Sequence, residues 1–146
     1  LPYPHSIPAM LMRAREAVMA RVRPTLRAYD MTEPQWRVLR TLSTVEEVEV
    51  TQLSEMVFLL PSSLSRILRD LGERGLIQRR TSAQDLRRGL VSISDQGMSL
   101  IQASMPDTAA VNAEIERLYG AERMIELRRL LRELEEALGP GAPGED

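Results

Sequence analysis

The spacing of apolar residues along this 146-residue chain predicts a mainly helical protein with one short hairpin. The clearest signal lies in residues 61–74, where leucines and one isoleucine recur at i, i+3, i+4 and i+7 and predict a helix face packed on a core. Residues 77–81 and 90–93 instead predict two short strands joined by a polar turn. The expected helices are 9–28, one beginning after Thr32, a short one beginning after Thr51, 61–74, 95–118 and 121–138.

Capping residues define several of these boundaries. Thr32 and Gln35 have the spacing of a capping box, and Thr51 is a second candidate N-cap, just after a possible small strand at Val48 and Val50. Ser94 is expected to cap helix 95–118, which Pro106 should kink or interrupt. Gly75 suits the end of helix 61–74, and residues 139–146 are expected to form a disordered tail.

Composition excludes several classes of site. The chain has no cysteine and a single histidine, His5, so disulfides, thiolate metal sites, thiol redox sensing and a histidine-dependent catalytic triad are not expected. We therefore predict no metal, no cofactor and no enzymatic activity. No apolar run approaches the about 20 residues that span a bilayer, and no signal peptide is visible, so we expect a cytoplasmic protein.

Positive charge is concentrated in one part of the chain, although the net charge is −2. All 19 basic residues are arginine. Residues 61–94 contain seven arginines against three acids, whereas residues 32–60 contain two arginines against five acids. The distribution of charge therefore favours a nucleic-acid surface over 61–94.

The order of short helix, tight connection, second helix and hairpin is typical of a winged helix-turn-helix. Small hydroxyls near the start of helix 61–74 permit close approach to DNA, with arginines beyond them, and serine is also a common cap. Arg87 at the hairpin tip can enter a minor groove, held by an ion pair with Asp85, whereas Arg79 and Arg80 are equally consistent with edge charges that oppose aggregation. The predicted DNA-binding residues are Ser62, Ser63, Ser65, Arg66, Arg69, Asp85, Arg87 and Arg88.

Residues 71–97 resemble the signature of the MarR family of bacterial transcriptional regulators, and they read LGERGLIQRRTSAQDLRRGLVSISDQG. The matching residues are Leu71, Gly75, Leu76, Ile77, Asp85, Arg87, Arg88, Ser94 and Gly97. Ser94 stands where the family commonly has threonine, and both residue types can cap a helix. Helix order extends the resemblance over 9–138, and residues 14–42 are similar to the homoprotocatechuate-operon regulators within the family.

The resemblance implies one MarR-like domain over 1–146, in which helices 9–28 and 95–138 form a dimerisation lobe and 32–94 form the winged helix-turn-helix. It implies a homodimer on a pseudo-palindromic double-stranded DNA operator, in accord with the leucine stripe of 127–138. It also implies a crevice for phenolic acids between the lobes. The candidate lining residues are Arg15, Trp36, Met12 and Met19. Their simpler interpretations stay open: an inter-helix salt bridge for Arg15, and core packing for the other three.

We therefore expect a homodimeric, ligand-responsive regulator, most simply a repressor, of an operon for aromatic-compound catabolism. In this hypothesis a phenolic or aromatic acid releases it from DNA. The alternative is a regulator of drug efflux or stress response with a promiscuous pocket. A winged helix used only for protein interaction would not need the basic hairpin, and a peroxide sensor would lack its usual cysteine.

Overall fold

The computed structural model describes residues 3–143, which form six α-helices, a short 3-10 helix and a three-stranded sheet. The mainly helical class predicted from the sequence is confirmed. In chain order the elements are η1 (Tyr3–His5), α1 (Ile7–Arg27), α2 (Glu33–Leu42), β1 (Val48–Glu49), α3 (Val50–Val57), α4 (Pro61–Glu73), β2 (Ile77–Thr81), β3 (Gly89–Ile93), α5 (Asp95–Tyr119) and α6 (Ala121–Leu138).

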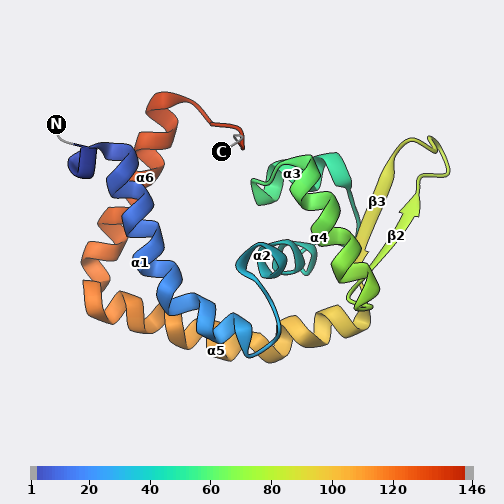
Figure 1. Ribbon diagram of the computed structural model, residues 1–146, viewed down its shortest axis with the longest axis horizontal. Helices are drawn as coiled ribbons and strands as arrows, with labels where there is room; N and C mark the ends of the chain where they lie inside the picture. Colours follow the sequence, from blue (N-terminus) through green and yellow to red (C-terminus); the bar gives the residue numbers. More distant parts are fainter. Residues whose placement is uncertain (1–2, 144–146) are drawn as a thin grey trace.

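The elements divide into two lobes joined by the long helix α5 (Figure 1). Helices α1 and α6 stand at one end of α5, whereas α2, α3, α4 and the hairpin gather at its other end (Figure 1). This arrangement is the predicted winged helix-turn-helix beside a lobe built from the N- and C-terminal helices.

A leucine-rich core stabilises the lobe formed by α2, α3, α4 and the sheet. Helix α4 contributes the stripe expected from its sequence, with Leu64, Leu68 and Leu71 completely buried and Ile67 at the edge. These side chains pack with Leu39 of α2 and other buried residues of α3 and the sheet. Because α4 buries one face, its opposite face is left to solvent.

The sheet is antiparallel, with strand order β1-β3-β2. β2 and β3 form the predicted hairpin, in register from Ile77 opposite Ile93 to Thr81 opposite Gly89. The two-residue strand β1 pairs with the edge of β3 that faces away from β2, with Val48 opposite Val91. The hairpin turn, residues 82–88, projects away from the rest of the lobe (Figure 1).

Two predicted helix starts are confirmed at atomic detail. The Thr32 hydroxyl accepts from the Gln35 amide at 3.3 Å, and the Gln35 side chain accepts from the Thr32 amide at 3.0 Å, which completes the capping box. The Ser94 hydroxyl accepts from the Gly97 amide at 3.0 Å. The predicted end of α4 is also confirmed, since Gly75 has a φ of +74°.

Two local predictions are wrong. Thr51 is not an N-cap, because α3 begins at Val50, two residues before the start that a Thr51 cap would give. Its N-cap is Glu49, which together with Val48 pairs with β3. Of the two effects expected of Pro106, interruption of the helix is wrong, because α5 runs continuously through the proline. The helix bows gently along its length (Figure 1). The missing proline amide frees the carbonyl of Gln102, and both residues are exposed, so the carbonyl can bind water.

The predicted tail begins where α6 ends. Residues 139–143 are neither helix nor strand, and 144–146 lie outside the described residues. Disorder of this tail stays a prediction. Within 3–143, no helix combines the length and apolar character that crossing a membrane requires.

Candidate functional site

The outward face of α4 carries the predicted hydroxyls and arginines. Ser62, Ser65, Arg66 and Arg69 are exposed, and Ser63 is half-buried. The N-cap of α4 is Leu60, followed by Pro61 at the first helical position, and no side chain caps this end. The interpretation of the serines as N-caps is therefore wrong, and their hydroxyls lie along the first turns of the helix.

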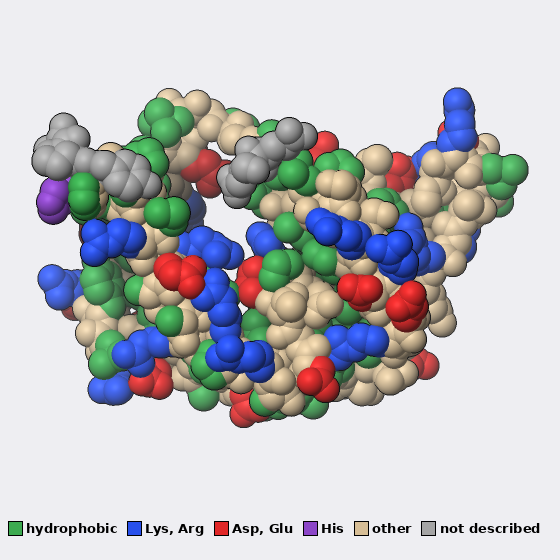
Figure 2. Space-filling model, in the orientation of Figure 1, with side chains coloured by type: hydrophobic (Ala, Val, Ile, Leu, Met, Phe, Trp, Pro, Cys, Tyr) green, Lys and Arg blue, Asp and Glu red, His purple; other side chains and the backbone are tan. Residues whose placement is uncertain are grey.

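The hairpin tip presents one arginine almost completely to solvent. The Arg87 side chain is 92% exposed, and its Nε lies 3.2 Å from Asp85 Oδ1. The same carboxylate oxygen accepts from the Arg87 amide at 3.0 Å, so Asp85 fixes both the turn and the guanidinium. The predicted ion pair is confirmed, and basic side chains extend to the far end of the hairpin (Figure 2).

Two other hairpin arginines are paired with acids beside β1. The Arg80 guanidinium donates two hydrogen bonds to Glu47, at 2.8 and 2.6 Å, and Arg88 contacts Glu49. The hydrogen bonds from Arg80 lower the pKa of the Glu47 carboxyl. Neither acid was predicted from the sequence, because only the β1–β3 pairing brings them to the hairpin. Arg88 is thus less free to meet DNA than Arg87.

A cavity of about 340 Å³ lies between α1 and the start of α2, where the two lobes meet. Its lining residues are Arg15, Met19, Arg23, Arg27, Met31, Thr32, Glu33, Pro34 and Arg37. We call this cavity the interlobe pocket. Two of the four predicted ligand residues, Arg15 and Met19, line it.

The other two predicted ligand residues lie elsewhere. Met12 is 58% exposed on α1. Trp36 is half-buried against the core, and its Nε1 donates to Ser104 Oγ of α5 at 3.3 Å. The structure therefore supports the core interpretation of Trp36 and gives the tryptophan a second role as a link to α5.

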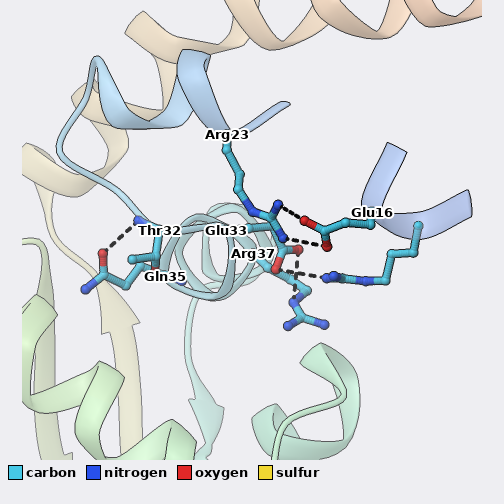
Figure 3. A network of polar contacts seen from close by, with 7 residues as sticks. Glu16, Arg23, Thr32, Glu33, Gln35 and Arg37 are labelled. Carbon is cyan, nitrogen blue, oxygen red and sulfur yellow. Dashed lines mark hydrogen bonds and ion pairs between the residues drawn. The ribbon is translucent and has the colours of Figure 1, made fainter. Parts of the chain in front are cut away.

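Four arginines and one acid, Glu33, line the interlobe pocket. Figure 3 shows Glu33 beside Arg37, with the Arg23–Glu16 pair nearby. Glu33, whose side chain is 18% exposed, lies 3.6 Å from Arg15 Nη2 and 3.4 Å from Arg37 Nε. The inter-helix salt bridge considered for Arg15 is thus present. Neither contact satisfies hydrogen-bond geometry, and within the described chain Glu33 Oε2 and Arg37 Nε are buried without a hydrogen-bond partner.

Beside this group, Arg23 pairs with Glu16, which lies about two turns earlier on the same face of α1, with one contact at 3.1 Å. The hydrogen bond lowers the pKa of Glu16. Glu33 and Arg37 were not predicted as pocket residues, although the sequence places them four residues apart at the start of a helix. The net positive lining can hold an anion. Over residues 3–143, no three acidic or histidine side chains come together as metal ligands.

Comparison with known proteins agrees with this geometry. The model of the MarR family matches residues 31–88. The Homoprotocatechuate degradative operon repressor of Escherichia coli is 30% identical over 128 residues, which cover 88% of this chain and 86% of that protein. The chain belongs to the MarR family.

Solved structures place it among MarR-type transcriptional regulators. The transcriptional regulator PA4135 is 32% identical with a TM-score of 0.84, over 90% of this chain and 96% of that chain. NadR in complex with 4-hydroxyphenylacetate is also 32% identical, with a TM-score of 0.73, over 88% of this chain and 92% of that chain. Both the family resemblance and the narrower similarity to homoprotocatechuate regulators are confirmed.

Proposed function

We propose that this MarR-family regulator is a homodimeric repressor of an operon for aromatic-compound catabolism, and that a phenolic or aromatic acid releases it from a pseudo-palindromic operator. The similarity to the Escherichia coli repressor and to NadR supports the class of operon and of effector. The observation that carries the proposal is the pairing, in one chain, of an exposed arginine-tipped hairpin with an arginine-lined pocket between the lobes.

DNA binding is supported by two exposed basic surfaces, one on α4 and one at the hairpin tip. Helix α4 offers hydroxyls and the exposed Arg66 and Arg69 to a major groove. Arg87 extends from the hairpin toward the adjacent minor groove, where a narrow A·T-rich stretch attracts a guanidinium. Phosphate contacts supply most of the affinity, and the α4 side chains supply the sequence preference.

A homodimer is supported by the apolar surface of the lobe that α1 and α6 form with the adjoining end of α5. Helices α1, α5 and α6 leave many large apolar side chains exposed in the single chain: Ile7, Leu11, Val18, Leu118, Ile125, Leu130, Leu131, Leu134 and Leu138. Surface of this kind marks an interface. A two-fold dimer through these helices places two α4 helices on successive turns of the operator.

An acidic effector is supported by the charge of the interlobe pocket. The Arg15 side chain is 57% exposed and approaches Glu33 without hydrogen-bonding it, so its guanidinium donors are available to a ligand carboxylate. Met19 and Met31 supply apolar lining for an aromatic ring. The pocket volume of about 340 Å³ suits a single-ring compound.

Release follows if the effector prefers a dimer whose α4 helices are wrongly spaced for the operator. The effector shifts the equilibrium only by its difference in affinity for the two states. Because the interlobe pocket is bounded by α1 of one lobe and α2 of the other, filling it acts on the angle between them.

The test is release of the protein from DNA upstream of its own gene by a small ligand panel. The panel pairs 4-hydroxyphenylacetate and homoprotocatechuate with the uncharged 4-hydroxyphenylethanol. We expect the acids to release the DNA and the alcohol to fail. Release by the alcohol and by unrelated cationic drugs would favour the efflux-regulator alternative instead.

A further inference from the structure

The turn between α1 and α2, residues 28–31, is tightly ordered and borders the interlobe pocket. Asp30 adopts a φ of +54°, and the amides of Tyr29, Asp30 and Met31 bind carbonyls of the last turn of α1 at 3.0–3.1 Å. The residues on either side of the turn tip, Arg27 and Met31, both line the pocket. The pocket therefore reaches both ends of this turn.

On one side the turn binds the end of the DNA-binding helix. Arg74 is the C-cap of α4, and its Nη1 donates to the Asp30 carbonyl at 2.8 Å. Its Nη2 lies 3.5 Å from the Tyr29 carbonyl. These two contacts attach the turn to the C-terminal end of α4.

On the other side the turn binds the middle of α5. The Tyr29 ring packs against the core, and its hydroxyl lies 3.0 Å from the Ala103 carbonyl and contacts the Asp107 carboxylate. These two acceptors share one phenolic proton. The contact with Asp107 raises the pKa of Tyr29, which keeps the hydroxyl protonated and able to donate.

The segment that follows α4 also packs directly on the start of α5. The Ser94 hydroxyl donates to the Gly75 carbonyl at 2.6 Å, and a Cβ on Gly97 would lie 2.2 Å from the Leu76 carbonyl oxygen. This attachment is short and close-packed, so it acts as a pivot between the end of α4 and the start of α5. Rotation of the DNA-binding lobe about that pivot must change the bonds of Tyr29 to α5.

We propose that Tyr29 is a positioning residue that couples occupancy of the interlobe pocket to the placement of α4, through Arg74 on one side and Asp107 with Ala103 on the other. This inference rests on the proposed function. We call the hydrogen bonds of Tyr29 to Ala103 and Asp107, together with those of Arg74 to the turn, the relay. These bonds are solvent-accessible and polar, so they can exchange with water at modest cost. The Ser94–Gly97 pivot, in contrast, cannot open without disrupting packing.

The first test compares Tyr29→Phe with the matched control Tyr119→Phe in the full chain. The control removes a hydroxyl that makes no hydrogen bond within residues 3–143. The quantity measured is the operator Kd with saturating 4-hydroxyphenylacetate divided by the Kd without it. We expect Tyr29→Phe to lower this ratio by about threefold or more, because one charge-assisted hydrogen bond is lost, and Tyr119→Phe to leave it unchanged.

An unchanged ratio in Tyr29→Phe would overturn the proposal. So would an equal change in the affinity of the DNA-free protein for 4-hydroxyphenylacetate, because Tyr29 would then act inside the pocket. If the wild-type protein binds DNA but is not released by the acid, the proposed function fails on its own, and the spacing test below still decides the role of Tyr29.

The spacing test needs no effector. Wild-type protein should bind an operator with one base pair inserted between its half-sites much more weakly than the native operator. We expect Tyr29→Phe and Asp107→Ala to narrow that difference by about threefold or more, and Asp107→Asn, which keeps an acceptor oxygen, to retain most of it. Asp107 is exposed, so its variants are expected to keep the fold. They therefore provide the test if Tyr29→Phe fails to fold. Identical spacing discrimination in Asp107→Ala and wild type would refute the relay.

Discussion

Replacing Arg87 by alanine removes the most exposed charge of the hairpin tip without disturbing the fold. The side chain is 92% exposed and its partner Asp85 also accepts from the backbone amide, which the substitution retains. The unfolding free energy should therefore be nearly unchanged, since a surface ion pair contributes little. DNA affinity should respond strongly, because the substitution also leaves the Asp85 charge uncompensated beside the phosphates.

The expected loss follows from the number of contacts. Each subunit loses one arginine contact with DNA, worth about 1 to 3 kcal/mol. A dimer loses two, or about 2 to 6 kcal/mol, which weakens operator binding by about 30-fold to 3 × 10⁴-fold. The slope of log K against log salt should become shallower by about 1.8.

Fluorescence anisotropy of labelled operator DNA at several salt concentrations measures both quantities. Arg132→Ala is the matched control, because it removes the same charge from an exposed position on α6, in the other lobe. It should bind like the wild type. Unchanged affinity in Arg87→Ala, or an equal loss in Arg132→Ala, would contradict the assignment of the hairpin as a DNA contact.

Three further outcomes are expected. Arg15→Ala should blunt release by 4-hydroxyphenylacetate while operator affinity without effector stays within about threefold, as measured by the same anisotropy titration; joint loss of both would make Arg15 structural. Leu68→Ala, at a completely buried position, should lower the unfolding free energy by about 3 kcal/mol or more in urea denaturation. Glu47→Gln should lower the thermal midpoint at pH 7. The lowered pKa of Glu47 makes its stabilisation present above about pH 4 and lost as pH falls through that lowered value, so variant and wild type should converge in acid.

Local chemistry accounts for the parts of the fold that the sequence predicted. The capping box at Thr32 and the Ser94 cap depend on residues three positions apart, and the α4 stripe depends on helical spacing alone. The Asp85–Arg87 pair also lies within one turn of chain. Each of these features is determined by neighbours in the sequence, so no knowledge of tertiary contacts was needed.

Tertiary contacts decide the features that the sequence did not predict. The start of α3 is determined by pairing of β1 with β3, across about forty residues of chain, as the Val48–Val91 pair shows. The interlobe pocket depends on how α1 crosses the start of α2, which places Glu33 among arginines and leaves Met12 outside. Apolar spacing gave no information on that crossing.

One anisotropy titration tests DNA binding and effector response together: wild-type protein onto DNA from upstream of its gene, at low and moderate salt, with and without 4-hydroxyphenylacetate. We expect tight binding that weakens steeply with salt and is reversed by the acid. Affinity that does not change with salt concentration, or no binding at all, would contradict the role of α4 and the hairpin as the DNA-contacting surfaces. Tight, salt-sensitive binding that no aromatic acid reverses would contradict the effector assignment alone.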